Sequence, residues 1–471
     1  MNNLQVTVLG LGKSGLALAR ELGARGCRLL LSDTRTQEQL APVLAELGEL
    51  EYELEAGGHT ARVYEGQDLV VISPGVSIHH PILKAALQAG VPVAGEVEIA
   101  ARLSELPFVA VTGTNGKSTT VTLIGSMLGR RGLVAGNIGT PLVGQVTHAE
   151  PGVEWVVAEI SSFQLESTHT FRPRIAVLTN LTPDHLDRHP NLEEYEAAKA
   201  RMFSCLGHGD VAVLPLDEPH GPRFAEWIQN GQFPAWLDGF EPPAREGRPR
   251  LVWFSGQREP DQGVWCHDGR VYHQADGHTR ELFDWNFPNL PGPHNLVNGL
   301  AATAVALELG VDLDDIVRAL REHHNLHFRL ERVAVLDGVE YINDSKATNV
   351  ASVVAALEAC PQPIVLIAGG KDKGFDFSEL ASAIARRVRH LMLIGEAAQR
   401  LQEAVQSTGF DSIVRCQSLK EAVERAHACA EPGGSVLLSP ACSSFDMFAH
   451  AEERGEKFSQ FVRELDAEVS V

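Results

Sequence analysis

A short segment at residues 112–118 has the composition of a phosphate-binding loop, since it reads Thr-Gly-Thr-Asn-Gly-Lys-Ser and follows an apolar run. Glycines let backbone amides approach phosphate oxygens, Lys117 can reach the β- and γ-phosphates of a nucleotide, and the Ser118 hydroxyl can bind Mg²⁺. The complete Walker spacing has a glycine where this chain has Val111, so the loop is a shortened variant. A purely structural turn would leave the Lys-Ser pair unexplained, and we therefore predict a binding site for ATP.

A second glycine-rich segment, Gly-Leu-Gly-Lys-Ser-Gly at residues 10–15, also lies between a strand-like run and a helical pattern. Alone, this pattern with Asp33 at the end of the next strand predicts a dinucleotide site in which the carboxylate binds a ribose hydroxyl. A packing role for the glycines is the alternative. The segments at 33–35 (Asp-Thr-Arg) and 73–75 (Ser-Pro-Gly) end later strands, where ligands of open α/β sheets bind, but plain turns explain each of them equally well.

Three further side chains are candidates for metal chemistry. Glu159 ends an apolar strand, and a carboxylate there suits a Mg²⁺ ligand, with a surface glutamate as the alternative. His185 follows the next strand, where metal binding and a structural role stay equally open. Lys199 lies on a predicted helix, and by spacing alone it is an ordinary solvated lysine.

The last third of the chain places lysines and small residues directly after two strands. These segments are Asn-Asp-Ser-Lys-Ala-Thr-Asn at 343–349 and Gly-Gly-Lys-Asp-Lys-Gly at 369–374, and a third turn, Ser-Pro-Ala-Cys-Ser-Ser-Phe-Asp, follows at 439–446. Such lysines could bind a terminal phosphate or the carboxylates of an acidic substrate. A plain turn explains one such segment more easily than it explains both.

Alternating strand and helix patterns position all of these segments, and they predict an α/β fold with parallel sheets. A chain of 471 residues is too long for one core, so we expect three domains. The predicted domains are residues 1–106, 107–326 and 327–471. Between 218 and 293 many prolines and glycines accompany five of the six tryptophans without long helical periodicity, which predicts a β-rich elaboration of the central domain. A strong helix is expected over residues 295–309.

Composition limits the class of protein. The formal net charge of −21 argues against a nucleic-acid partner, which needs a clustered basic surface. No apolar run approaches the ~20 residues that span a bilayer, so we expect a cytoplasmic protein without membrane insertion. The seven cysteines form no CxxC pair, which favours buried, reduced thiols over a zinc site. We expect a monomer.

Taken together and in this order, the motifs resemble those of the Mur ligase family over nearly the whole chain. They are TGTNGKS, NIGTP at 137–141, EISSFQLE at 159–166, TNLTPDHLDRH at 179–189, HNLVNGLAA at 294–302, NDSKATN and SPACSSFD. Several are shared by all members, whereas NDSKATN with SPACSSFD favours the branch that adds D-glutamate to UDP-N-acetylmuramoyl-L-alanine. The resemblance implies a Rossmann-like N-terminal domain, a central P-loop-type ATP-binding α/β domain and a Rossmann-like C-terminal domain.

The resemblance also implies roles for individual residues, which we state as expectations. The catalytic residues would be Lys117, Glu159, His185 and Lys199. ATP would be bound by Thr112, Gly113, Thr114, Asn115, Gly116, Lys117, Ser118, Asn295, Arg329 and Asp344. The UDP-linked substrate would be bound by Ser14, Asp33, Thr34, Arg35, Ser73, Pro74, Gly75, Asn137 and Ser161. The amino acid would be bound by Lys346, Thr348, Lys373, Ser444 and Phe445.

Two Mg²⁺ ions are implied as cofactors, with Ser118, Glu159, His185 and Lys199 as ligands. In the family the lysine at the position of Lys199 becomes carbamylated to N6-carboxylysine. The resemblance therefore implies that Lys199 is a metal ligand, although its spacing alone indicates an ordinary solvated lysine. Two positions depart from the family pattern: Phe328 replaces a histidine near the nucleotide, and Ala451 replaces a phenylalanine near the glutamate.

The implied reaction is ATP-dependent amide formation through an acyl phosphate. Its rivals are a Mur ligase for another amino acid or a folylpolyglutamate synthetase. An NAD-dependent dehydrogenase built on residues 10–15 would leave Lys117 and Ser118 without a task. A non-catalytic nucleotide-binding protein would leave Glu159, Lys199 and His185 unexplained.

Overall fold

The computed structural model describes residues 3–185, 188–236, 240–324 and 326–469. The chain forms two compact units. Unit 1 comprises Met1–Leu181, Asn191–Asn286 and Val297–Arg321, and it contains an N-terminal and a central sheet. Unit 2 comprises Thr182–Pro190, Phe287–Leu296 and Glu322–Val471, and it contains a C-terminal sheet. The predicted boundaries after residues 106 and 326 stay predictions.

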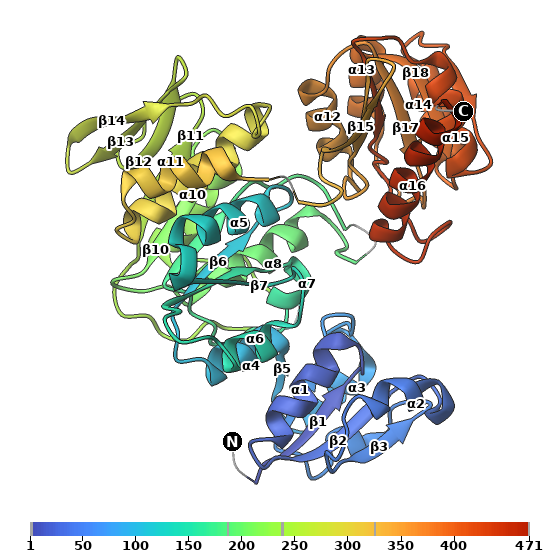
Figure 1. The fold of residues 1–471 in the computed structure, drawn as a ribbon. Helices are drawn as coiled ribbons and strands as arrows, with labels where there is room; N and C mark the ends of the chain where they lie inside the picture. Colours follow the sequence, from blue (N-terminus) through green and yellow to red (C-terminus); the bar gives the residue numbers. More distant parts are fainter. Residues whose placement is uncertain (1–2, 186–187, 237–239, 325, 470–471) are drawn as a thin grey trace. The chain divides into compact units, whose positions relative to one another are not determined.

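The N-terminal sheet is parallel, with the strand order β3-β2-β1-β4-β5 (Figure 1). Its strands are β1 (Gln5–Leu9), β2 (Arg28–Asp33), β3 (Glu53–Ala56), β4 (Leu69–Ile72) and β5 (Val93–Gly95). Its helices are α1 (Lys13–Gly23), α2 (Gln37–Ala45), α3 (Pro81–Gln88) and α4 (Glu96–Leu103). The strand order reverses beside β1, so the glycine segment at 10–15 follows the strand where such sheets bind ligands.

The central sheet has the order β14-β13-β12-β11-β10-β9-β6-β8-β7, parallel from β7 to β12 and antiparallel beyond. Its strands are β6 (Phe108–Thr112), β7 (Gly132–Gly136), β8 (Trp155–Glu159), β9 (Ile175–Leu178), β10 (Val211–Pro215), β11 (Arg250–Ser255), β12 (Gly263–His267), β13 (Arg270–Ala275) and β14 (His278–Asp284). Because β9, β6 and β8 are neighbours, their carboxyl ends bring the phosphate loop, Glu159 and Asn180 to one edge.

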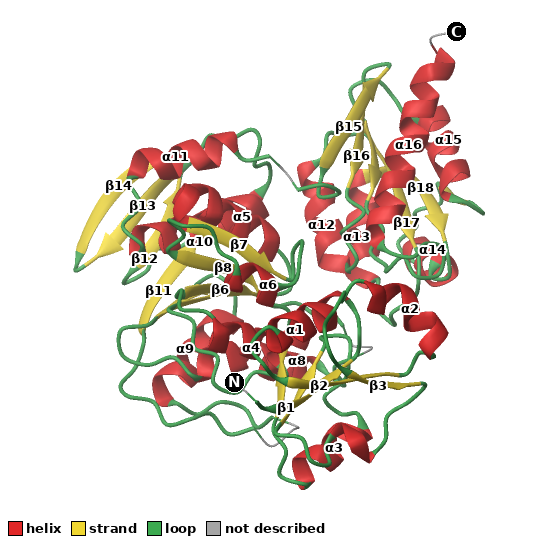
Figure 2. Cartoon of the chain, turned by 60° about the horizontal axis from the view of Figure 1, so that its bottom comes forward, coloured by secondary structure: helices red, strands yellow, loops and turns green. Residues whose placement is uncertain are grey.

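The helices of this part are α5 (Lys117–Leu128), α6 (Leu142–Thr147), α7 (Ser162–Leu165), α8 (Leu192–Ser204), α9 (His220–Asn230), α10 (Pro293–Glu308) and α11 (Leu313–Glu322). The predicted β-rich elaboration is present as β11 to β14, and Figure 2 shows these strands at one end of the sheet. The segment also contains one helix that the sequence analysis did not single out, α9. Pro219 and Pro222 flank the start of α9, where proline is tolerated.

The C-terminal sheet has the order β15-β16-β20-β17-β18-β19, with β15 antiparallel to β16 and all other pairs parallel. Its strands are β15 (Glu331–Leu336), β16 (Val339–Asn343), β17 (Ile364–Gly369), β18 (Val388–Ile394), β19 (Ile413–Arg415) and β20 (Ser435–Leu438). Its helices are α12 (Val350–Ala359), α13 (Ser378–Arg387), α14 (Ala398–Gln406), α15 (Leu419–Cys429) and α16 (Ala451–Val469). The neighbouring strands β16, β20 and β17 lead directly into the three segments at 343–349, 439–446 and 369–374.

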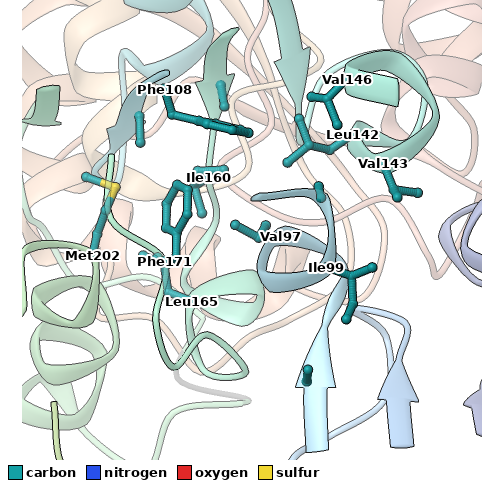
Figure 3. Close-up of a cluster of buried hydrophobic side chains, with 14 of the residues drawn as sticks. Val97, Ile99, Phe108, Leu142, Val143, Val146, Ile160, Leu165, Phe171 and Met202 are labelled. Carbon is teal, nitrogen blue, oxygen red and sulfur yellow. The ribbon is translucent and has the colours of Figure 1, made fainter. Parts of the chain in front are cut away.

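The core of unit 1 extends from the central sheet to α4 (Figure 3). Val97 and Ile99 of α4 belong to the same buried cluster as Leu142 of α6. In that cluster the rings of Phe108 and Phe171 stand at 90° with centroids 5.6 Å apart. Helix α4, which follows the last strand of the N-terminal sheet, is therefore packed into the apolar core of the central sheet. This packing holds in place Glu96, a residue of α4 that lines a cavity of unit 1.

Six of the seven cysteines are buried, as expected for reduced thiols, and Cys429 is half-buried. None of the helices in the described ranges combines the length and the apolar character needed to cross a bilayer.

Candidate functional site

The phosphate loop joins β6 to α5, as predicted. Gly113 and Gly116 have φ angles of +147° and +81°, a region that side chains disfavour. A Cβ atom on Gly116 would also lie 2.1 Å from the Asn298 side-chain oxygen. Neighbouring segments hold the loop, since Asn115 N–H donates to the Asn180 side-chain oxygen at 3.0 Å. The glycines are thus required by the backbone path that leads into α5.

Two lysines converge on this loop. Lys117 Nζ donates to the carbonyl oxygens of Gly113 at 2.9 Å and Thr114 at 2.7 Å. Lys199 Nζ donates to the same Gly113 oxygen at 2.8 Å and lies 4.5 Å from the centre of the Tyr195 ring. Lys199 is only 1% exposed, so the interpretation of an ordinary solvated lysine was wrong. Tyr195, which sequence reasoning missed, precedes Lys199 by four residues and therefore shares its helix face.

Ser118 and Glu159 form the part of the predicted magnesium site that the structure brings together. Ser118 Oγ donates to Glu159 Oε2 at 2.5 Å, and Asn137 Nδ2 donates to Glu159 Oε1 at 3.0 Å. Glu159 is 3% exposed. A hydroxyl and a carboxylate oxygen in contact are hard ligands that fit Mg²⁺.

His185 belongs to unit 2, whereas Glu159 and Lys199 belong to unit 1, so their predicted joint site stays a prediction. The preceding residue, Asp184, is bonded by Asn349 Nδ2 at 2.9 Å and lies 3.5 Å from Lys373 Nζ. Burial alone would raise the pKa of Asp184, but the charges of His185 and Lys373 and the Asn349 bond lower it. Residues 186 and 187 of the TNLTPDHLDRH motif lie outside the described residues. Within the described ranges no cluster of three or more His, Cys, Asp or Glu side chains forms a metal site.

A cavity of about 480 Å³ lies beside the glycine segment of the N-terminal sheet. It is lined by Gly10, Leu11, Gly12, Lys13, Ser14, Asp33, Ser73, Pro74, Gly75, Val76, Glu96, Gly136, Asn137, Gly139, Thr140, Pro141 and Gln164. Six of the residues expected to bind the UDP-linked substrate are in this lining: Ser14, Asp33, Ser73, Pro74, Gly75 and Asn137. The structure therefore gathers them around one space.

The other three expected residues have different surroundings. Arg35 pairs with Asp33 at 2.8 Å, and the Leu11 N–H donates to the same carboxylate at 2.8 Å. Burial opposes ionisation of Asp33, but these bonds outweigh it and lower its pKa to about 2. Ser161 caps α7 through its hydrogen bond with Gln164. The cavity lining includes none of Thr34, Arg35 and Ser161. Arg35 thus acts on the cavity through Asp33.

Three segments meet at the carboxyl edge of the C-terminal sheet around one buried arginine. Arg454 of α16 is fully buried and donates to Ser345 Oγ at 3.0 Å, Ser345 O at 2.8 Å and Cys442 O at 3.1 Å. Burial lowers its pKa to about 10. A Cβ atom on Gly370 would lie 3.2 Å from the same guanidinium. Arg454 was missed, although an arginine on the apolar stripe of a helix was a usable signal.

Asp344 is buried on the same edge and accepts from Ser439 Oγ at 2.8 Å and Leu330 N at 3.2 Å. Burial raises its pKa to about 7 despite these bonds. Lys346 forms an ion pair with Glu452, Ser444 is buried, Thr348 is half-buried and Phe445 is 67% exposed. The expected amino-acid residues thus lie on adjacent segments of unit 2.

Besides Asp344, the nucleotide-binding residues predicted in unit 2 are Asn295 and Arg329. Asn295 is buried and its side chain donates to Pro291 O at 2.8 Å. Phe328, beside Arg329, has a φ of +64°, and a Cβ atom on Gly455 would lie 2.4 Å from its ring. The ring of Phe328 therefore packs on α16. Ala451, the other position that differs from the family pattern, is the first residue of α16, and its carbonyl oxygen accepts from Ser345 Oγ at 2.7 Å.

Comparisons with known proteins agree with this arrangement. Three family models match: "Mur ligase MurD-like, N-terminal domain" over residues 4–95, "Mur ligase middle domain" over 111–306 and "Mur ligase, glutamate ligase domain" over 328–442. Solved structures of MurF from Acinetobacter baumannii and of MurC from Thermotoga maritima share the fold. Their TM-scores are 0.60 and 0.58, both at 17% identity, and they cover 96% and 98% of this chain and 90% and 100% of their own.

The chain therefore belongs to the Mur ligase family, and the predicted three-domain α/β fold is confirmed. Among its relatives are proteins of Pelotomaculum thermopropionicum, 42% identical over 98% of both chains, and Syntrophotalea carbinolica, 44% identical over 98% of this chain and 97% of theirs. Each relative is named UDP-N-acetylmuramoylalanine–D-glutamate ligase.

Proposed function

We propose that this chain joins D-glutamate to UDP-N-acetylmuramoyl-L-alanine at the expense of ATP, a step of peptidoglycan precursor synthesis. The observation that carries the proposal is similarity along 98% of the chain to ligases of that name. The cavity of unit 1 and the phosphate loop supply the matching chemistry, because they offer a nucleotide-sized space and a triphosphate loop on one unit.

The proposed reaction has two steps. The substrate carboxylate attacks the γ-phosphorus of ATP, which breaks the bond to the β-phosphate and yields ADP and an acyl phosphate. The glutamate amine then attacks the acyl carbon, loses a proton, and displaces inorganic phosphate to leave an amide. Both steps bring anions together, so bound cations are needed to reduce the repulsion.

The residues of this chain would divide the work as follows. Lys117 would exchange its bonds to the Gly113 and Thr114 carbonyls for phosphate oxygens. Bound Mg²⁺ would neutralise charge on the phosphates, held by Ser118 and Glu159. A carbamate on Lys199 would add a second carboxylate beside the loop, and His185 would complete a second metal site. Asn137 would bind the muramoyl part of the substrate, because it joins the cavity lining to Glu159.

The amino acid would bind to unit 2 through Lys346, Thr348, Lys373, Ser444 and Phe445. Arg454 supports this assignment, because it holds the backbone of two of these segments in place. ATP and a UDP-linked substrate are cytoplasmic metabolites, which supports a cytoplasmic location. We also propose a monomer, which sedimentation velocity would test.

The test is phosphate release with UDP-N-acetylmuramoyl-L-alanine, ATP, Mg²⁺ and a panel of acceptors. D-glutamate should support turnover, while L-glutamate, L-lysine and a folate substrate should not. Lys117→Ala should lose activity about 10³-fold, the scale of removing one preorganised phosphate contact. Lys457→Ala, an exposed lysine of α16, is the matched control and should keep the wild-type rate. Turnover with another acceptor in preference to D-glutamate would contradict the proposal.

The acyl phosphate has its own test. Substrate labelled with ¹⁸O in the terminal carboxylate should transfer one label to the released phosphate. Unlabelled phosphate would exclude this intermediate while leaving the ligase assignment intact. Absorbance titration with NADH should detect no binding, which separates the ligase from the dehydrogenase alternative.

A further inference from the structure

Glu96 is a buried carboxylate in the wall of the unit 1 cavity, and neither the motifs nor the reaction assign it a task. It is 3% exposed and is the first residue of α4. Val143 N–H donates to Glu96 Oε1 at 3.3 Å, and Leu142 N–H and the Ser14 hydroxyl also donate to the carboxylate. Glu96 therefore links the first turn of α6 to the first turn of α1 across one side of the cavity.

The carboxylate of Glu96 has no ion-pair partner among the residues in the described ranges. On α1, Lys13 is in the cavity lining, and on β2, Asp33 is paired with Arg35. Residues 142–147 of α6 carry no charged side chain. On α4 itself, Glu98 is paired with Arg102. Among the described residues that line this cavity, only Lys13 carries a positive charge.

A UDP-linked substrate would add two negative charges to this cavity, because each phosphate of its diphosphate carries one. Ser14 is expected to contact that substrate and already contacts Glu96, so the two anions would be separated by one side chain. Like charges at such a distance in a poorly hydrated site repel by several kcal/mol if neither is neutralised. Burial already raises the pKa of Glu96, although bonds from Ser14, Val143 and Leu142 oppose the shift.

We propose that Glu96 takes up one proton from solvent when the UDP-linked substrate binds, and that its neutral carboxyl keeps α6 and Ser14 in place. Glu96 is thus a positioning residue whose protonation is coupled to substrate affinity. The inference rests on the proposed function for the identity of the ligand. The protonated carboxyl retains an oxygen that accepts from Val143, and it gains a donor that suits a hydroxyl or phosphate oxygen.

Proton uptake can be measured directly. Binding of UDP-N-acetylmuramoyl-L-alanine to the full chain is followed by calorimetry in pairs of buffers with different ionisation enthalpies. The phosphates of this ligand are diesters, which do not titrate near neutrality, so uptake reports on the protein. Uptake should approach one proton per site at the pH where free Glu96 is ionised, and the dissociation constant should rise by up to about tenfold per pH unit there.

Variants assign the proton to this side chain. Glu96→Gln should abolish the uptake and flatten the pH dependence, whereas Glu96→Asp should retain both. Glu21→Gln is the matched control, since Glu21 is a buried carboxylate of α1 outside the cavity lining, and it should bind like wild type. Unchanged uptake in Glu96→Gln, or wild-type binding with no uptake at any pH at which the protein stays folded, overturns the inference. Failure of the ligand to bind at all would instead refute the proposed substrate.

Discussion

Lys199 offers a sharp test of the active-site chemistry because its ammonium shares one acceptor with Lys117. Both Nζ atoms lie within 3 Å of the Gly113 carbonyl oxygen. Two like charges about 5 Å apart repel by roughly 3 kcal/mol at an effective dielectric constant of about 20. Carbamylation of Lys199 would replace one positive charge by a negative one, so the same geometry would become attractive.

The perturbation is Lys199→Met, which keeps an unbranched chain of similar length but cannot carry a carbamate. Because the volume is nearly conserved and Gly113 O keeps its bond from Lys117, packing should change little, and the free energy of unfolding should change by no more than about 3 kcal/mol, the size of the electrostatic interaction. Loss of the carboxylate should lower kcat by about 10²–10³-fold, the effect of removing one preorganised electrostatic contact, about 2.7–4 kcal/mol. Fold and activity should therefore separate in this variant.

The assay is phosphate release over a series of Mg²⁺ concentrations, with urea unfolding of the same samples. Lys457→Met is the control for loss of a lysine that is exposed. Protein equilibrated with ¹³C-bicarbonate should show one carbamate resonance that is absent from Lys199→Met. Wild-type turnover by Lys199→Met at every Mg²⁺ concentration would refute the reasoning.

Three other predictions follow from single contacts. Burial opposes ionisation of Glu98, but bonds from the N–H groups of residues 169–171 outweigh it and lower the pKa of Glu98. Glu98→Gln should therefore lower the free energy of unfolding by about 3 kcal/mol. Urea unfolding should also show that wild type loses stability in acid as Glu98 is protonated, whereas the variant does not. Burial raises the pKa of Asp344 to about 7, so stability should fall by up to roughly 4 kcal/mol between about pH 4 and 7, and Asp344→Asn should flatten that profile. A Cβ atom on Gly15 would lie 2.0 Å from Gly10 O, so Gly15→Ala should raise KM for the UDP-linked substrate at least about tenfold, whereas Gly144→Ala, with open space around it, should not.

The sequence predicted the strands and their ligand-binding ends well, because buried parallel strands are continuous apolar runs. The apolar run before the phosphate loop and the one that Glu159 ends are strands β6 and β8 in the structure. Helix α9 was not singled out although Phe224, Trp227 and Ile228 have helical spacing, since it lies in a segment rich in proline and glycine. Element type was therefore least predictable where such residues are frequent.

Side-chain environment was harder to predict than backbone. Every residue of α8 from Tyr195 to Ser204 is buried, including Lys199. The residue type of Lys199 gave no sign that other segments cover its face of the helix. Periodicity locates the apolar face of a helix but does not say what packs on the polar one. Arg454 was predictable in principle, since it stands four residues before Phe458 on the buried face of α16. Glu96 gave no signal, because its partners belong to α1 and α6.

The first turns of α4 carry two glutamates whose ionisation has opposite consequences. Glu96 and Glu98 are two positions apart, about 200° around the helix, so they face different neighbours. Lower pH favours protonation of Glu98, which weakens its hydrogen bonds to residues 169–171. Higher pH favours the ionised form of Glu96 inside the cavity. With the proton uptake proposed above, this helix would limit one activity at both low and high pH, and a bell-shaped pH profile need not originate at the reacting atoms.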